Sequence, residues 1–237
     1  MKSAIIIICY NTASFLPRQV ESFRKFCLDP DVKIIVVDNS TDPQAIIDIK
    51  YHSEINGCWY VKTIPQTKSP SWSHSFACNV IFQTYKNTFD FLFYVDHDLF
   101  AIKPFSIKET LKDNVLAGIE QKRHLNREFS YLWPGCMMFN MGLVNKDWVD
   151  FSPKEGLDTG GSMHIFIDNH KPSEILYFTE EYGQNEDFNK NIYNFYSLIY
   201  DKTFMHFICG SNWAEQPDHE ERINSLFNLL EKNTNAN

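Results

Sequence analysis

The sequence has 237 residues, of which 43% are hydrophobic and 22% are charged. This balance is that of an ordinary globular chain, and it excludes a disordered, collagenous or coiled-coil protein. Its 22 Lys and Arg residues against 30 Asp and Glu give a formal net charge of −8, which argues against a protein that binds nucleic acid through the phosphate backbone. A single nucleotide is still an acceptable ligand, because a bound metal ion can supply the positive charge.

The longest apolar run, residues 4–10, is too short for a membrane-spanning helix, which needs about 20 apolar residues. No small-residue cleavage site follows this run, so we expect neither export nor an integral membrane segment. The six cysteines contain no CxxC pair, which disfavours a zinc ribbon or a redox motif and is typical of reduced thiols. These features predict a cytoplasmic protein.

Strand-like and helix-like segments alternate along the first hundred residues. Apolar β-branched runs predict strands, and apolar residues near a 3.6-residue period predict helices. The expected elements, in chain order, are a strand at 4–9, a helix at 15–26, a strand at 33–37, a helix at 44–50, a strand at 59–64, a helix at 69–86 and a strand at 89–95. This alternation predicts an α/β fold with a mostly parallel central sheet.

The second half has a less regular pattern. The polar and basic stretch 120–133 predicts a long loop, and Asp218 with Glu221 forms a capping box that predicts the start of a last helix. The other expected elements are strands at 115–119 and 136–140, a short helix at 162–168, and strands at 174–178 and within 197–207.

Polar residues follow three of the predicted strands. In parallel α/β sheets ligands bind beyond the carboxyl ends of the strands, so these residues should converge on one rim. They are Tyr10-Asn11, Asp38-Asn39-Ser40 and Asp96-His97-Asp98. Asp96 and Asp98 could both approach one hard divalent cation where the backbone turns. A lone DxD is usually just a polar turn, but its place beside two other polar strand ends favours the cation site.

These three segments resemble the GT-A glycosyltransferases, which transfer a sugar from a nucleotide-sugar donor. Residues 6–11 (IIICYN) and 33–42 (KIIVVDNSTD) are similar to the opening strands of glycosyltransferase family 2. Residues 93–98 (FYVDHD) are similar to the DxD motif that holds Mn²⁺ or Mg²⁺ on the donor diphosphate. The resemblance covers roughly residues 3 to 213 and implies a GT-A fold, a Rossmann-like α/β sheet with helices on both faces.

The resemblance also implies which residues contact the nucleotide. Tyr10 and Asn11, preceded by Cys9, would lie against the base, and Asp38 would accept a hydrogen bond from the base edge. An aromatic face can stack on a base, and a carboxylate can accept from the N–H of uracil. Asn79 falls where family 2 often has Ala-Arg-Asn near the donor, with a cysteine replacing the arginine here.

The metal ligands implied by the resemblance are Asp96, Asp98 and His206, with His97 at the donor between the two carboxylates. His206 is included because residues 205–213 resemble the HF-x-G-x-x-K-P-W signature of glycosyltransferase family 8, although the lysine and proline of that signature are absent. An imidazole beside two carboxylates suits Mn²⁺ better than Mg²⁺.

Two carboxylates are candidates for the catalytic base on the acceptor side. Asp158, in Leu-Asp-Thr-Gly-Gly, precedes a predicted short helix at the spacing where family 2 places its base. Asp187 follows Glu186 and also spells the Glu-Asp pair of that family, but it lies in an acidic stretch typical of a solvated surface. Asp158 is preferred. Residues 133–140 resemble the glycine-containing strand that lines the sugar and acceptor pocket.

The resemblance therefore implies a metal-dependent glycosyltransferase that moves a sugar from a nucleoside diphosphate sugar, a UDP-sugar, to a hydroxyl of an acceptor such as a glycan. We treat 1–237 as one domain: a nucleotide-binding half (1–100), a sugar and acceptor half (101–213), a C-terminal helix (214–232) and a frayed tail (233–237). Two alternatives stay open. One is a sugar nucleotidyltransferase, although the glycine-rich basic loop of such enzymes is missing; the other is a catalytically inactive module on the same fold that binds a nucleotide sugar, a carbohydrate or a protein partner.

Overall fold

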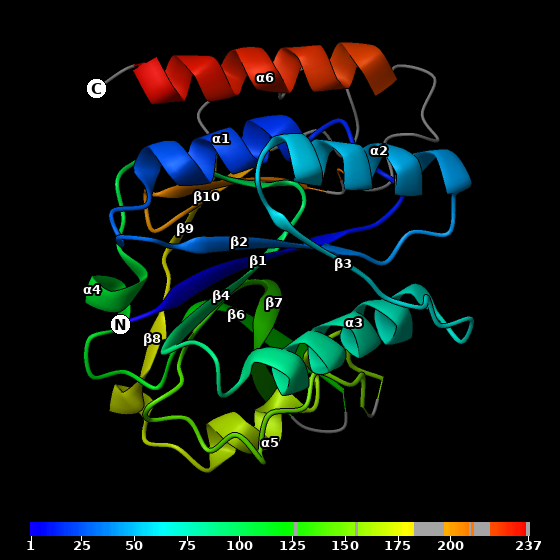
Figure 1. Cartoon of the computed structure of the whole chain (residues 1–237). Helices are drawn as coiled ribbons and strands as arrows, with labels where there is room; N and C mark the ends of the chain where they lie inside the picture. The colour runs from blue at the N-terminus through cyan, green and yellow to red at the C-terminus, as the bar shows by residue number, and fades with distance from the viewer. Residues whose placement is uncertain (126–127, 155, 183–196, 209, 211–218, 236–237) are drawn as a thin grey trace.

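The computed structural model describes residues 1–125, 128–154, 156–182, 197–208, 210 and 219–235. A seven-stranded mixed sheet forms its centre (Figure 1). β1 pairs in parallel with β2 and β4, and β2 with β3. β7 is antiparallel to both β4 and β6, and β8 is parallel to β6. In spatial order the strands are β3 (Trp59–Lys62), β2 (Lys33–Asp38), β1 (Ser3–Cys9), β4 (Phe91–Asp96), β7 (Glu128–Asn140), β6 (Leu116–His124) and β8 (Ile175–Tyr177).

Helices cover both faces of this sheet. The described helices are α1 (Leu16–Phe26), α2 (Pro43–Ile55), α3 (Pro70–Tyr85), α4 (Ile107–Leu111), α5 (Met163–Asp168) and α6 (His219–Asn235), with a 3₁₀ turn at Pro172–Glu174. Figure 1 shows α1 and α2 on one face and α3 and α5 on the other. This arrangement confirms the predicted α/β architecture.

The strands at the centre are buried on both sides because their side chains alternate between two cores. On β1, Ile6 and Ile8 pack with α3 residues such as Ile81, while Ile5 and Ile7 pack with α1 residues such as Phe23. All seven residues of β1 are buried. A strand covered on both faces reads as a continuous apolar run, which is the pattern that predicted it.

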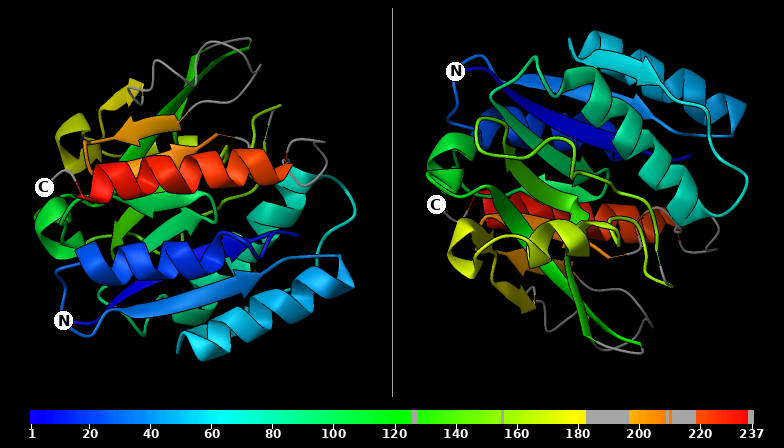
Figure 2. Two further views of the ribbon diagram at one scale, coloured as in Figure 1. Left: turned by 90° about the horizontal axis from the view of Figure 1, so that it is seen from above. Right: turned by 90° about the horizontal axis from the view of Figure 1, so that it is seen from below.

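A second, four-stranded antiparallel sheet joins distant parts of the chain. Its strands, in spatial order, are β5 (Leu99–Ala101), β11 (Phe204–Phe207), β10 (Ser197–Tyr200) and β9 (Glu180–Tyr182). α6 packs on this sheet through Leu226 and Leu230, which share a core with Phe100 and Phe207 (Figure 2). Among the described helices, none has both the length and the apolar character needed to span a membrane.

The predicted loop at 120–133 is wrong. These residues belong to the β6–β7 hairpin, in which Glu120 pairs with Leu132 and His124 with Glu128. On the β7 side, Phe129 and Tyr131 are buried while Ser130 between them is half-buried, which is the period-2 pattern of a strand. The polar residues that suggested a loop lie at the exposed end of the hairpin. Their side chains face solvent and do not pack on a core, so they need not be apolar. The capping residue Asp218 lies outside the described residues.

Candidate functional site

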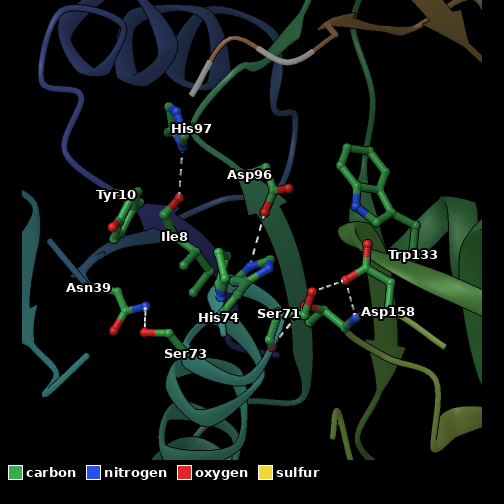
Figure 3. Close-up of a pocket in the computed structure, with 12 residues that line it drawn as sticks. Ile8, Tyr10, Asn39, Ser71, Ser73, His74, Asp96, His97, Trp133 and Asp158 are labelled. Atoms are coloured by element: carbon green, nitrogen blue, oxygen red, sulfur yellow. Dashed lines mark hydrogen bonds and ion pairs between the residues drawn. The ribbon is translucent and has the colours of Figure 1, made fainter. Parts of the chain in front are cut away.

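A pocket of about 300 Å³ opens at the carboxyl ends of β1, β2 and β4 (Figure 3). Residues from both halves of the chain form its walls, including the loops after β1 and β2, the start of α3, the end of β4, β7 and the loop before α5. The lining side chains are Ile8, Tyr10, Asn39, Pro70, Ser71, Ser73, His74, Asp96, His97, Trp133, Asp158 and Thr159. The strand ends therefore converge on one rim, as the sequence predicted.

The loop after β1 is bonded to the loop after β2. Tyr10 is 40% exposed and lines the pocket, so its ring is available to a ligand. Asn11 has a positive φ of 50°, and its Oδ1 accepts hydrogen bonds from the backbone N–H groups of Thr41 (2.8 Å) and Asp42 (3.0 Å). Cys9 is fully buried, and burial raises its pKa well above the ordinary thiol value. Of these three predicted contacts, only Tyr10 lies on the pocket wall.

Asp38 ends β2 and is fully buried. Its Oδ1 accepts from the Ser40 N–H at 2.8 Å, and its Oδ2 accepts from the Tyr60 hydroxyl at 2.7 Å. Burial and the bond to Asp38 raise the pKa of Tyr60. Both carboxylate oxygens thus have donors inside the protein, and the neighbouring Asn39 lines the pocket instead.

Asn79 lies on α3 but not on the pocket wall. Its Oδ1 accepts from the Phe151 N–H at 3.0 Å, and its Nδ2 donates to Asp150 Oδ1 at 3.2 Å. These bonds fasten the 150–152 turn to α3. The structure therefore gives Asn79 a supporting position beside the site.

Asp96 faces the pocket from the end of β4. Its Oδ1 lies 3.2 Å from Nε2 of His74 on α3 (Figure 3). Burial alone would lower the pKa of His74, but the neighbouring Cys78 and the Asp96 carboxylate outweigh burial and raise it well above its ordinary value. The imidazolium form of His74 is therefore favoured beside Asp96. His97, the next residue, has its Nδ1 3.3 Å from the Ile8 carbonyl oxygen and also lines the pocket.

Asp98 and His206 form a second carboxylate–imidazole pair. Asp98 Oδ1 lies 3.3 Å from His206 Nε2, and the Tyr200 hydroxyl is 2.9 Å from the other ring nitrogen of His206. Trp133 stacks obliquely on the His206 ring, with centroids 4.5 Å apart. Burial alone would raise the pKa of Asp98, but the charges of His206 and His97 hold it below its ordinary value. The ionised carboxylate is therefore the favoured form.

The three predicted metal ligands divide between these two pairs. Among the residues that the structure describes, no three His, Cys, Asp or Glu side chains come together as a metal site. The 3.3 Å between Asp98 Oδ1 and His206 Nε2 nevertheless suits two adjacent ligands of one cation. A carboxylate oxygen and an imidazole nitrogen at this separation would suit a divalent cation.

Asp158 lies on the wall formed by α3 and the loop before α5. Its Oδ1 accepts hydrogen bonds from the Ser71 hydroxyl and from the Thr159 N–H, the latter at 2.7 Å. The Thr159 hydroxyl donates in turn to the Ser71 carbonyl at 3.1 Å. These bonds hold the Asp158 carboxylate at the pocket (Figure 3). The alternative base, Asp187, lies outside the described residues.

His74 and Ser71 are site residues that the sequence did not single out. Both lie in the first turns of α3, in the stretch Ser-Trp-Ser-His-Ser, which carries polar residues on consecutive positions. A run of this kind directly after a predicted helix start is the signal that could have identified them. The contacts of His74 with Asp96 and of Ser71 with Asp158 join residues more than 20 positions apart in the sequence, and local sequence patterns contain no information about such contacts.

We expect Gly135→Ala to damage the site and the fold together. A Cβ at Gly135 would lie 2.0 Å from the Trp133 ring and 2.6 Å from Asp96 Oδ2, so both pocket side chains would have to move. Overpacking of this kind costs about 1–3 kcal/mol. Thermal unfolding should show a lower Tm. The matched control is Gly142→Ala, whose Cβ meets only Asn140 Oδ1 at 3.4 Å; equal effects of the two substitutions would contradict the expectation.

Comparison with known proteins finds similarity to solved structures at low sequence identity. A scan against protein-family models and a search of curated proteins returned no match. Solved structures of glycosyltransferases are similar to it. A mannosyltransferase, PcManGT from Pyrobaculum calidifontis in complex with GDP-Man and Mn²⁺, superposes with a TM-score of 0.48 and 13% identity over 73% of this chain and 55% of that chain.

Two further structures are similar at the same level. TarS from S. aureus has a TM-score of 0.46 and 16% identity over 69% of this chain and 32% of that chain. The galactosyltransferase LgtC, in complex with donor and acceptor sugar analogues, has a TM-score of 0.45 and 14% identity over 73% of this chain and 72% of that chain. The chain thus spans 55% of the mannosyltransferase and 32% of TarS.

Proposed function

We propose that the protein is a metal-dependent glycosyltransferase that transfers a sugar from a nucleoside diphosphate sugar, a UDP-sugar, to a hydroxyl group of a glycan acceptor. The observation that carries the proposal is the pocket at the strand ends, where the carboxylates of Asp96 and Asp158 lie on the walls of one cavity. Transfer to a hydroxyl needs a donor site and a proton acceptor within reach of each other, and these two carboxylates can divide those tasks.

The donor would lie along the strand ends. Tyr10 would stack on the base, since its ring is exposed at the pocket, and Asp96 would contact the ribose or the cation. Asp38 would support the base end by holding the turn that presents Asn39. Placement of the nucleotide against a prebuilt polar rim is the usual arrangement in α/β sheets.

Asp98 and His206 would hold the divalent cation, Mn²⁺ in preference to Mg²⁺. A bound cation would stabilise the negative charge of the departing diphosphate as a Lewis acid. The chain's own contribution would be to present Asp98 Oδ1 and His206 Nε2 3.3 Å apart and to orient the His206 ring through Tyr200. In an acidic protein, a cation bound at this site would supply the positive charge that the diphosphate requires.

A screen of nucleotide sugars tests the proposal directly. The purified chain is incubated with each nucleotide sugar and Mn²⁺, and release of free nucleoside diphosphate is measured with and without a mixture of saccharide acceptors. We expect release from a UDP-sugar. Tight nucleotide binding without release would instead identify a binding module, and release of pyrophosphate from a nucleoside triphosphate and a sugar phosphate would identify a nucleotidyltransferase.

We expect UDP to raise the Tm more than GDP or ADP in the presence of Mn²⁺. The pocket volume of about 300 Å³ is at the lower end of ordinary ligand pockets, so the smaller pyrimidine ring should fit it better than a purine. At about a hundredfold excess over Kd the shift should be roughly 5 °C or more. Tyr10→Ala should reduce the shift, whereas Tyr51→Ala, an exposed tyrosine on α2, should not. Equal shifts for the three nucleotides would contradict the assignment of the base.

A further inference from the structure

A second cavity, of about 700 Å³, lies beside α3 and α5 and is larger than the pocket at the strand ends. Two tryptophans and an isoleucine supply its apolar surface, and two carboxylates and an amide supply its polar surface. These residues are Trp72, Trp148 and Ile165, and Asp147, Asp150 and Asn169. None of them belongs to the proposed donor site.

Shared lining residues link this cavity to the pocket at the strand ends. A smaller cavity of about 340 Å³ shares Trp72, Pro153 and Lys154 with the large one, and it shares Ser71 with the pocket. Ser71 is the residue whose hydroxyl donates to Asp158. The three cavities therefore adjoin one another in series from Asp158, along the start of α3, to Trp148, and we call this series the groove.

The walls of this groove have the chemistry that binds sugar rings. Trp148 is 47% exposed, which is high for a large aromatic side chain, and its indole can cover the C–H face of a pyranose while its N–H donates a hydrogen bond. The carboxylates and the Asn169 amide can bond sugar hydroxyls. Asp147 and Asp150 outnumber Lys154 among the charged residues of the wall, so an anionic ligand is disfavoured.

We propose that this groove binds the body of a neutral or amino-sugar oligosaccharide, with the sugar unit that accepts the transfer placed at Asp158. The inference deepens the proposed glycosyltransferase function and rests on it. Trp148 holds a sugar unit several positions from the reacting hydroxyl, and Ser71 marks the passage between the groove and the pocket. Oligosaccharides should therefore bind more tightly than the corresponding monosaccharides.

The test is binding to a printed saccharide array that includes neutral, amino-sugar, sialylated and sulfated oligosaccharides. Wild type is compared with Trp148→Ala, which removes the exposed ring, and with Tyr51→Ala, which removes a still more exposed ring on α2. We expect binding to neutral or amino-sugar oligosaccharides. The Kd of the best of them, measured by isothermal calorimetry, should rise roughly tenfold or more in Trp148→Ala and stay unchanged in Tyr51→Ala. The Tm and the UDP-dependent Tm shift of Trp148→Ala should equal those of wild type.

Three outcomes would overturn the proposal: no saccharide bound, binding that Trp148→Ala leaves unchanged, or a preference for sialylated or sulfated chains. Trp148-dependent binding of peptides on a parallel peptide array, without saccharide binding, would overturn it as well. Failure here is distinct from failure of the proposed function, because UDP-sugar cleavage is measured separately. Saccharide binding through Trp148 without any cleavage of a UDP-sugar would support saccharide binding in the groove and contradict the proposed glycosyltransferase activity.

Discussion

Asp158→Asn should lower kcat about 10²–10⁴-fold, a loss on the order of 3–5 kcal/mol of barrier, while UDP binding stays nearly unchanged. Asp158 Oδ1 is the atom that accepts from Ser71 and Thr159, and an asparagine oxygen can accept both bonds in the same place. The substitution therefore keeps the geometry of the loop and removes the carboxylate that we propose accepts the proton. Single-turnover kinetics with saturating donor measures the chemical step directly.

Asp168→Asn is the matched control, because Asp168 is an exposed carboxylate at the end of α5. It should leave kcat unchanged. The stereochemistry of the product gives an independent check, since a general base at Asp158 requires inversion at the anomeric carbon, which NMR of the product shows. The resemblance of the His206 segment to family 8 favours the opposite course. A retained anomer, or a normal kcat for Asp158→Asn, would remove Asp158 from the mechanism, and Asp187 would be the next residue to test.

The first half of the fold could be predicted because its strands are covered on both faces. Ile5 to Ile8 and Ile34 to Val37 are continuous apolar runs, and each run is a strand in the central sheet. The next two helices begin at side-chain caps that local sequence contains, Asp42 before α2 and Ser69 before α3. Sequence patterns and structure agree where a strand is buried along its whole length or a helix begins at a local side-chain cap.

The second half could not be predicted as well, because its strands depend on partners far away in the chain. β5 is only three residues long and is a strand because it pairs with β11, about a hundred residues later. The exposed end of the β6–β7 hairpin is polar because it is in contact with solvent, as a loop is. Local periodicity cannot distinguish the two, since the hydrogen bonds that decide between them come from the opposite strand.

The site could be predicted as a place but not as a set of roles. The strand ends after β1, β2 and β4 do form one rim, yet Asp38, expected at the base edge, is fully buried and bonded to Ser40 and Tyr60. A motif gives residue types at positions and does not give burial. His74, which had no motif, lies 3.2 Å from Asp96 on the pocket wall because α3 and β4 pack in one core.

Chelation by EDTA should abolish sugar transfer, and Mn²⁺ should restore it more fully than Mg²⁺. The physical reason is that a protein with a formal net charge of −8 must stabilise a leaving diphosphate, and Asp98 with His206 supplies a carboxylate oxygen and an imidazole nitrogen 3.3 Å apart for a cation. Asp98→Asn keeps the size of a side chain that is only 6% exposed and avoids the cavity that alanine would leave. We expect it to weaken Mn²⁺ binding, measured by EPR titration in the presence of UDP, by about 100-fold or more, because even residues that merely support metal ligands cost 10–100-fold.

Asp201→Asn serves as the control for this substitution, since Asp201 is an exposed carboxylate in the turn between β10 and β11. It should leave both Mn²⁺ binding and transfer unchanged. The EPR titration separates loss of the cation from loss of the fold, because a misfolded variant would also lose its cooperative thermal transition. Full activity in EDTA would show that the diphosphate leaves without a cation, and the pairing of Asp98 with His206 would then serve only to join β4 to the four-stranded sheet.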